Sequence, residues 1–352
     1  MAEHARGAEI RKFITRHVEA HPSDIATFTA NKFKINERAV NFHLKRLSSD
    51  NVLEAKGNTR SRIYSLKVLT EWNHVYVIAP GLTEDLAWGE ILPIMRDLPK
   101  NVLSIWNTGF TEMFNNALEH SGGTEISVSV QKTAVHTELE ISDNGVGIFK
   151  KIQLALNLTD ERHAILELSK GKLTTNPEKH SGQGIFFTSR MFDSFYILSG
   201  GLFFTQDRDT KTNLLLQRDR FKTGTAVWMK IANDSDREEE KIYREYGGPE
   251  HDFAFAKTVV PVRLAQYGGD KLVSRSQAKM VLAGLEKFQI VSFNFTGVET
   301  IGQAFADEIF RVFARAHPEM QIGYTDANEN VTGMIQRATA ETSGLPPKEE
   351  MQ

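Results

Sequence analysis

The chain has 352 residues, of which 40% are hydrophobic and 25% charged, a composition that allows two or three globular domains. Its net charge of −3 gives the whole chain no preference for nucleic acid, and the absence of cysteine excludes disulfides, thiolate zinc sites and thiol nucleophiles. The first residues lack a signal-peptide core, and no apolar run approaches the roughly 20 residues of a membrane span. We therefore expect a cytoplasmic protein without a membrane partner.

The charge is unevenly distributed. Residues 1–66 contain 12 Lys and Arg against 7 Asp and Glu, whereas the remaining residues contain 30 against 38. A basic front end on an acidic body is typical of an appended nucleic-acid-binding module, although a solvated basic face is the alternative.

Residues 1–68 predict three helices and a hairpin. Helices are expected at 10–18, 23–30 and 36–47, with Ser23 and Asn36 as N-caps. In the third helix Val40, Leu44 and Leu47 share one face. Strands at 52–55 and 62–66 flank the turn signal at 57–59.

This first segment resembles the winged helix-turn-helix of bacterial regulators, above all in Ala-Val-Asn-Phe-His-Leu-Lys-Arg-Leu followed by Val-Leu-Glu. The resemblance implies that the third helix enters the DNA major groove and that the hairpin touches phosphate. The base-facing residues would be Arg38, Asn41 and His43, and the backbone-facing residues would be Lys45, Lys56, Arg60 and Arg62. The alternative is a protein-docking or dimerisation unit.

Residues 69–235 alternate between strand and helix patterns. Helices are expected at 82–96, 102–120 and 160–168, and strands at 75–78, 126–130, 135–141, 195–198, 214–217 and 226–231. This order predicts an α+β sandwich of helices on a mixed, mainly antiparallel sheet.

The first chemical motif is Glu-Met-Phe-Asn-Asn-Ala-Leu-Glu-His, from Glu112 to His120. Glu112 and Asn116 are four residues apart and lie on one helix face. An amide oxygen suits Mg²⁺ and a carboxylate suits a proton acceptor, so the pair is a candidate cation site and base. A solvated polar helix face is the alternative.

The second motif is Asp-Asn-Gly-Val-Gly-Ile, which starts at Asp143. Gly145 and Gly147 allow a sharp turn close to a flat ligand, and the carboxylate can accept a hydrogen bond from an exocyclic amine such as adenine N6. A plain turn or a calcium-loop fragment would have the same pattern.

The third motif contains Gly182 and Gly184 at the start of a helical pattern. A glycine-rich helix start offers N–H groups to phosphate. Lys170, Lys172, Lys179 and His180 make the preceding loop basic. The alternative is a capped helix behind a surface loop.

Thr225 follows Thr223-Gly224 ahead of a strand, where its hydroxyl could share a water with Asp143. A P-loop is excluded, because the only Gly-Lys pair, Gly171-Lys172, is followed by Leu and not by Ser or Thr. A Rossmann fold is excluded, because neither glycine cluster completes Gly-x-Gly-x-x-Gly after a strand.

In this order, the motifs resemble the GHKL ATPases of gyrase, heat-shock chaperones and histidine kinases, and Glu112 to His120 is most similar to the histidine-kinase and anti-sigma-factor kinase branch. The resemblance implies ATP and Mg²⁺ as cofactors. It makes Asn116 the Mg²⁺ ligand, Glu112 the base and Asp143 the adenine reader. It further assigns Gly145 and Gly147 to close approach, Gly182 and Gly184 to the phosphates as a lid hinge, and Thr225 to the adenine corner.

A histidine kinase also needs a phosphoacceptor helix with a His followed by an acidic residue. Only His251 meets that condition, and it follows the ATPase region. Histidine autophosphorylation is therefore not expected.

Residues 236–252 are predicted to be a charged linker and residues 341–352 a disordered tail. Between them, residues 253–340 resemble a STAS domain, the fold of anti-anti-sigma factors, through a buried strand at 290–295, a Thr-Gly-Val turn and a helix at 304–313. Where that family carries a phosphorylated serine this chain has Gln303, which cannot accept phosphate. An ordinary βα unit is the alternative.

These expectations describe an α+β multidomain protein with a winged helix, a GHKL α/β sandwich and a small STAS-like α/β domain. We expect an ATP-binding cytoplasmic regulator with slow or no hydrolysis, in which the STAS-like domain packs on the ATPase domain in cis. A homodimer on paired DNA half-sites fits this view. The alternatives are a serine/threonine protein kinase resembling the anti-sigma kinases and an ATPase clamp whose winged helix binds protein.

Overall fold

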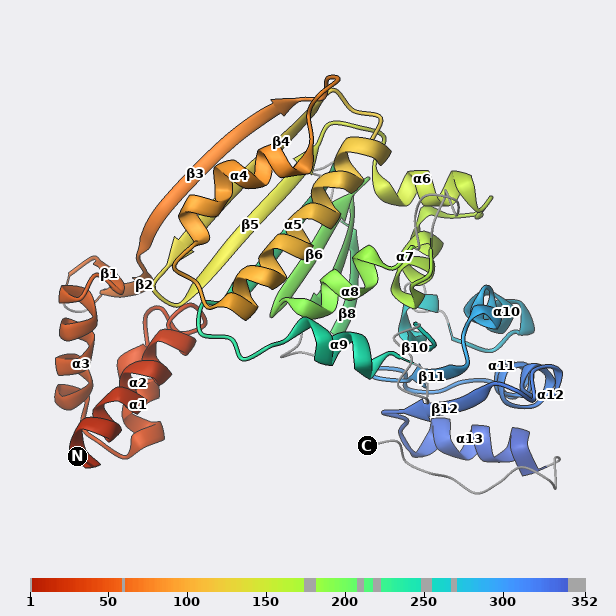
Figure 1. Cartoon of the computed structure of the whole chain (residues 1–352). Helices are drawn as coiled ribbons and strands as arrows, with labels where there is room; N and C mark the ends of the chain where they lie inside the picture. The colour runs from red at the N-terminus through yellow and green to blue at the C-terminus, as the bar shows by residue number, and fades with distance from the viewer. Residues whose placement is uncertain are drawn as a thin grey trace.

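The computed structural model describes residues 2–58, 61–173, 182–207, 212–217, 223–247, 255–266 and 271–340. We refer to residues 2–66 as the N-terminal unit, 68–232 as the central unit and 255–340 as the C-terminal unit. Figure 1 shows the N-terminal unit at one end of a large sheet and the C-terminal unit at the other.

The N-terminal unit has the predicted three helices and hairpin. They are α1 (Ala2–His17), α2 (Ile25–Phe33), α3 (Glu37–Ser49), β1 (Leu53–Lys56) and β2 (Ile63–Leu66). The expected cap of α3 is present, because Asn36 Oδ1 accepts a hydrogen bond of 2.9 Å from the Ala39 N–H. Ser23 is not the cap of α2, since the residue at that position is Asp24, whose carboxylate lies 3.1 Å from His21 Nδ1 instead.

The central unit is built on a seven-stranded sheet. Its strands are β3 (Val68–Val77), β4 (Glu125–Thr133), β5 (His136–Asp143), β6 (Ser194–Ser199), β7 (Leu202–Asp207), β8 (Thr212–Gln217) and β9 (Thr225–Ala232). Their order is β3-β4-β5-β9-β6-β7-β8, and every pairing is antiparallel. The predicted sandwich of helices on a mainly antiparallel sheet is confirmed, although β3 is longer than expected and β7 was not predicted.

Helices cover one face of this sheet (Figure 1). They are α4 (Glu84–Met95), α5 (Lys100–His120) and α8 (Gly184–Met191), while α6 (Ile148–Ala155) and α7 (Glu161–Lys170) follow β5 toward the C-terminal unit. On α5 the side chains of Trp106, Phe110 and Phe114 are fully buried. Their spacing of four residues places them on the face that meets the sheet, so burial of this stripe fixes the rotation of α5 about its axis.

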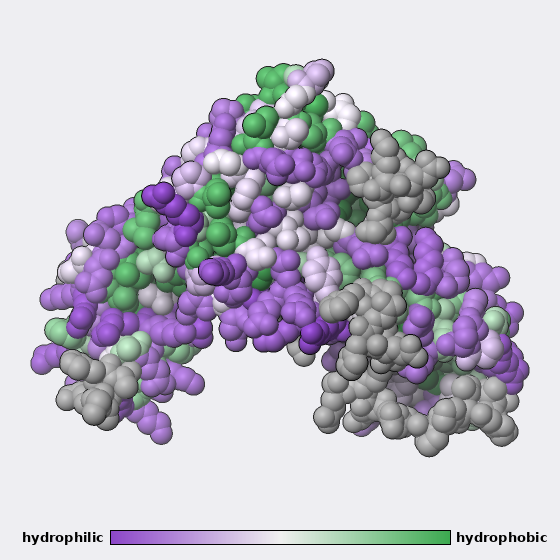
Figure 2. Space-filling view, in the orientation of Figure 1, coloured by the Kyte–Doolittle hydropathy of each residue, from purple (hydrophilic) through white to green (hydrophobic). Residues whose placement is uncertain are grey.

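The chain then passes through α9 (Glu239–Glu245), whose surface is hydrophilic in Figure 2, into the C-terminal unit. This unit has a parallel sheet of β10 (Lys257–Pro261), β11 (Ile290–Asn294) and β12 (Gln321–Thr325). Its helices are α10 (Arg275–Leu282), α11 (Gln303–Asp307), a π-helical segment at Glu308–Phe313, α12 (Ala314–Ala316) and α13 (Glu329–Ala340). One continuous cluster of buried hydrophobic residues runs through the central and C-terminal units, whereas the N-terminal unit has its own core.

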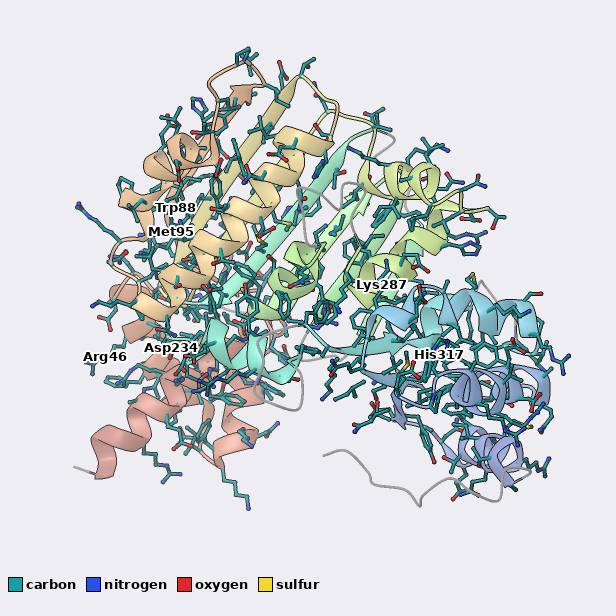
Figure 3. The ribbon with its side chains drawn as sticks, turned by 45° about the vertical axis from the view of Figure 1, so that its right-hand side comes forward. Arg46, Trp88, Met95, Asp234, Lys287 and His317 are labelled. Atoms are coloured by element: carbon teal, nitrogen blue, oxygen red, sulfur yellow. The ribbon has the colours of Figure 1, made fainter. Side chains whose placement is uncertain are left out.

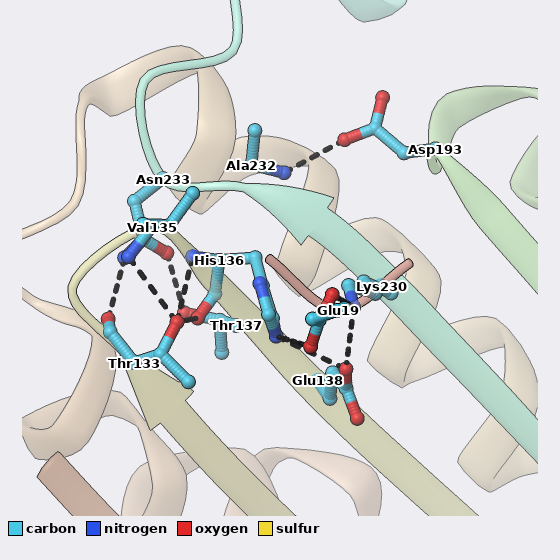
Figure 4. A network of polar contacts seen from close by, with 10 residues as sticks. All are labelled: Glu19, Thr133, Val135, His136, Thr137, Glu138, Asp193, Lys230, Ala232 and Asn233. Carbon is cyan, nitrogen blue, oxygen red and sulfur yellow. Dashed lines mark hydrogen bonds and ion pairs between the residues drawn. The ribbon is translucent and has the colours of Figure 1, made fainter. Parts of the chain in front are cut away.

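A polar cluster joins the N-terminal unit to the sheet (Figure 4). The ammonium of Lys230 donates a hydrogen bond of 2.8 Å to Glu19 Oε2, and it also lies 2.9 Å from Glu138 Oε1. His136, which is buried, places Nε2 3.1 Å from Glu138 and 3.8 Å from Glu19. Because Glu19 alone comes from the N-terminal unit, the cluster fixes that unit on the outer ends of β5 and β9.

In the part of the chain that the structure describes, no helix combines the length and the apolar character that a membrane crossing requires.

Candidate functional site

A cavity of about 330 Å³ opens where α5, α6 and α8 meet the ends of β5 and β9. The three sequence motifs converge on it. Its lining includes Glu112, Asn116, His120, Asp143, Gly147, Gly182, Gly184 and Thr225. Of the predicted pocket residues, Gly145 alone is not in the lining and lies behind the Asp143 carboxylate, to which its N–H donates a hydrogen bond of 2.8 Å.

Strand register brings Asp143 and Thr225 together although they are far apart in the sequence. The two residues are directly paired at the ends of β5 and β9. Burial raises the pKa of Asp143, and the backbone hydrogen bonds from Gly145 and Thr225 oppose that rise. Thr225 Oγ1 accepts the Ile148 N–H at 2.9 Å, which anchors the start of α6. One end of the cavity is thus a rigid polar corner.

The two glycines of the second motif are required by close approach. Gly147 has φ +95°, and a β-carbon there would lie 2.6 Å from Ser199 Oγ. At Gly145 a β-carbon would overlap the Ser121 carbonyl oxygen. A larger residue at either position would push the 143–147 turn away from α5 and β6, and the cavity residues on that turn would be displaced.

Asn116 and Glu112 occupy successive turns of α5, but their surroundings differ. Asn116 is half-buried, and its Nδ2 has no hydrogen-bond partner among the described residues. Rotation of the amide by 180° exchanges nitrogen and oxygen, so the group can present either a donor or an acceptor to a ligand. The Glu112 carboxylate is more exposed and lies against the first residue of α8, where a β-carbon on Gly184 would overlap Glu112 Oε2.

Lys151 is a site residue that the sequence analysis missed. It lies on α6 and lines the same cavity, where its Nζ donates to the His120 carbonyl at 2.6 Å. Burial lowers the pKa of Lys151. A half-buried ammonium bonded to a neutral carbonyl is suited to an anionic ligand. Its position one helical turn after Gly147 was the available signal.

Two of the four basic residues expected before the third motif, Lys170 and Lys172, do not line the cavity. Lys170 is buried and donates to Glu167 Oε1 at 2.7 Å and to the Ala283 carbonyl at 2.8 Å. Lys172 Nζ donates to the Lys287 carbonyl at 2.6 Å. Both cations are thus directed to the C-terminal unit, because α10 and β10 pack against the end of α7. Lys179 and His180 lie outside the described residues.

The candidate DNA-contacting residues fall into two groups. Arg38, Asn41, Lys45, Lys56 and Arg62 are exposed. His43 is half-buried, its Nδ1 is enclosed, and burial together with Arg11 and Arg46 lowers its pKa, so the structure does not bring it to the exposed face of α3. Arg60 lies outside the described residues.

In the C-terminal unit Gln303 is exposed and is the first residue of α11, which is where the resemblance to STAS domains placed it. The predicted linker, residues 236–252, is described as far as residue 247 and contains α9. Residues 248–254 and the predicted tail, residues 341–352, lie outside the described residues.

Comparison with protein-family models identifies two domains in the chain. Residues 93–202 match the model of the histidine kinase-like ATPase domain. Residues 277–332 match the model of a STAS-like domain of unknown function (DUF4325). The predicted resemblances of the central and C-terminal units are confirmed at this level, while neither match covers residues 1–68. No curated protein matches the chain.

Proposed function

We propose that the cavity binds ATP with Mg²⁺ and that the protein is an ATP-binding regulator. The observation that carries the proposal is that one cavity of the histidine kinase-like ATPase domain is lined by the half-buried carboxylate of Asp143 together with Asn116 and Lys151. Its volume of about 330 Å³ falls in the range of roughly 300–1,000 Å³ that is usual for small-molecule sites.

We place the adenine ring beside Asp143, whose carboxylate accepts hydrogen bonds. An ionised carboxylate has about four acceptor positions, and the backbone hydrogen bonds from Gly145 and Thr225 use two of them, so acceptor capacity remains for an exocyclic amine. Ile141, Ile152 and Val227 line the same cavity and offer an apolar surface to a flat ring. A base with a carbonyl at that place would meet the carboxylate oxygen and be rejected.

We place the phosphates near the ammonium of Lys151 and the amide of Asn116. Lys151 would hold phosphate oxygens, and the N–H groups at the start of α8 would add donors. The amide of Asn116 fits Mg²⁺, because its oxygen can turn toward the cavity and no described residue competes for the group. The metal ion would supply neutralisation of the phosphate charges.

The role of Glu112 decides between the rival functions. A carboxylate held at Gly184 can act as a proton acceptor toward water or toward a partner's hydroxyl. We favour slow or no hydrolysis, with protein serine/threonine kinase activity and a protein-binding clamp as the alternatives. Labelled ATP with candidate STAS partners separates them, and label transfer above an Asn116→Ala control would favour the kinase.

The test of the proposed site is calorimetric titration of the full chain with Mg·ATP, Mg·GTP and ADP. We expect ATP to bind and GTP to bind at least tenfold more weakly, since one missing or repelled hydrogen bond to a charged group is worth about 1.5–3 kcal/mol. Equal affinity for both nucleotides, or retained ATP affinity in Asp143→Ala, contradicts the assignment.

A second function, DNA binding, is proposed for the N-terminal unit as a winged helix. It is supported by the exposed Arg38, Asn41 and Lys45 on α3 and by the largely hydrophilic face of this unit in Figure 2. Mobility shifts with no nucleotide, ADP and a non-hydrolysable ATP analogue test both the binding and its coupling to the ATP site. Identical affinities in all three states would exclude the coupling, and nucleotide-dependent dimerisation without DNA retention would favour the clamp.

A further inference from the structure

The wall of the cavity that faces the C-terminal unit is formed by Leu173, Gly182 and the start of α8. Leu173 donates its N–H to the Gly182 carbonyl at 3.1 Å, which fastens these two wall residues to each other. What holds the pair in place is the preceding segment, residues 170–172.

Lys170 is the centre of that attachment. Its side chain is only 2% exposed, and its ammonium donates to two carbonyls at the C-terminal end of α10, those of Met280 at 3.1 Å and Ala283 at 2.8 Å. A helix C-terminus leaves its last carbonyls without helical partners and carries partial negative charge, so a buried cation there satisfies both. The neighbouring Glu167 carboxylate neutralises the ammonium.

The backbone of the same residue is held from the opposite side. Thr258 Oγ1, on β10, donates 2.7 Å to the Lys170 carbonyl. Gly171 follows with no room for a side chain, since a β-carbon there would lie 2.7 Å from the Phe255 ring. Lys172 then reaches the Lys287 carbonyl, at the junction visible in Figure 3.

The other stem of the wall, α8, is also packed on this side of the molecule. The ring of Phe186, which lines the cavity, lies 4.4 Å from that of Phe255 between ring centroids. Phe187 lies 5.0 Å from Phe255 and 4.5 Å from Tyr243 of α9. Phe255 therefore touches both stems, and residues of the C-terminal unit set the distance between them.

We propose that the C-terminal unit is a working part of the nucleotide site: it grips Lys170 and thereby positions Leu173, Gly182 and Gly184, so that nucleotide binding and docking of the C-terminal unit stabilise each other. Lys170 is a positioning residue in this scheme. The inference rests on the proposed ATP binding and adds its regulation, because any partner that pulls α10 or β10 away would lower nucleotide affinity. Reciprocity is required, since coupling between two sites is a single free energy.

The test combines calorimetry with backbone amide hydrogen exchange of the full chain, using a non-hydrolysable ATP analogue with Mg²⁺. In the wild type we expect the analogue to slow exchange in residues 275–288, which do not touch the cavity. Thr258→Val removes one grip with little change of volume, and Lys170→Met removes the main one. Each should weaken analogue binding by roughly fivefold or more, the usual lower range of such couplings, and should abolish the exchange response.

Lys279→Met is the matched control, because this lysine is on α10 but its side chain is 70% exposed and its ammonium lies 4.0 Å from Glu308. It should behave as the wild type in both measurements. Should Lys170→Met not fold, Thr258→Val carries the same comparison alone. Analogue binding to the wild type without any response in 275–288 overturns the coupling and leaves the ATP site standing, whereas no binding at all overturns both.

Discussion

The carboxylate of Glu112 lies directly against the backbone of Gly184, so closely that a β-carbon at position 184 would overlap Glu112 Oε2. The first and third sequence motifs therefore meet in space, where a side chain of α5 contacts the backbone at the start of α8. The Glu112 carboxylate can occupy this position because residue 184 is a glycine.

Gly184→Ala should leave the fold intact and impair the site. The overlap is with the tip of a flexible side chain, so Glu112 can swing away at small cost in unfolding free energy, but the wall of the cavity changes. We expect nucleotide affinity to fall by about tenfold, and much less in a Glu112→Ala background, where the overlap is absent. Calorimetry on the four proteins of this cycle measures the difference.

Gly89→Ala is the control for that cycle, because Gly89 is on α4 and a β-carbon there would meet nothing. It should keep wild-type affinity and gain up to about 1 kcal/mol of stability. Equal losses from Gly184→Ala with and without Glu112 would show that the two residues are not coupled.

Lys151→Met should separate the phosphate end from the base end of the ligand. The substitution removes the cation and retains the apolar stem, so we expect ATP affinity to fall by about tenfold or more while adenosine affinity changes little. Competition binding with ATP, ADP and adenosine measures this. Lys150→Met, one residue earlier and bonded to Gln153 and Glu161 instead of the cavity, should show no such ligand dependence.

Asp143→Asn should lower affinity without lowering stability. Burial raises the pKa of Asp143, so the folded protein holds that proton more tightly than the unfolded chain and the ionised carboxylate opposes folding at neutral pH. Asparagine removes this opposition, and the unfolding free energy at pH 7 should be unchanged or higher. Nucleotide affinity should drop about tenfold, because the amide has one acceptor oxygen, which the Gly145 N–H occupies, and its N–H₂ group is then left facing the exocyclic amine. For the wild type, affinity should also decline as acid protonates Asp143. Urea unfolding and calorimetry across pH 4–8 test both statements, and a large loss of stability in the variant would contradict them.

Glu138→Gln should weaken the joint between the N-terminal unit and the sheet in a pH-dependent way. The hydrogen bond from His136 and the ammonium of Lys230 lower the pKa of Glu138 from 4.5 to about 2. A depressed carboxyl pKa stabilises the fold above pH 4.5, and this contribution is lost as pH falls from 4.5 toward 2. The variant should therefore unfold at lower denaturant concentration than wild type at pH 7, and the gap should narrow below pH 4.5.

Glu19→Gln removes only the carboxylate that the N-terminal unit contributes, and it should expose residues 2–66 to proteolysis while the central sheet stays protected. Glu9→Gln, an exposed position on α1, is the matched control.

For Glu138→Gln, a difference in stability from the wild type that persists unchanged at pH 3 would show that the ion cluster is not its cause.

The sequence by itself determined the elements that depend on local chemistry. The Asn36 cap, the hairpin in the N-terminal unit, the apolar stripe of α5 and the three glycine- and acid-rich motifs are encoded by residue type and spacing within one or two turns. The order of those motifs was enough to identify the ATPase-like region, and the strand, turn and helix start at 290–305 were enough to identify the STAS-like region. Tertiary structure decided everything that depends on which segments meet. Register placed Asp143 beside Thr225, helix packing turned Lys151 into the cavity, and contact with α10 drew Lys170 away from it. The sequence shows that Lys170 is a cation, but it does not show which carbonyls the cation contacts, because those contacts come from residues more than one hundred positions away.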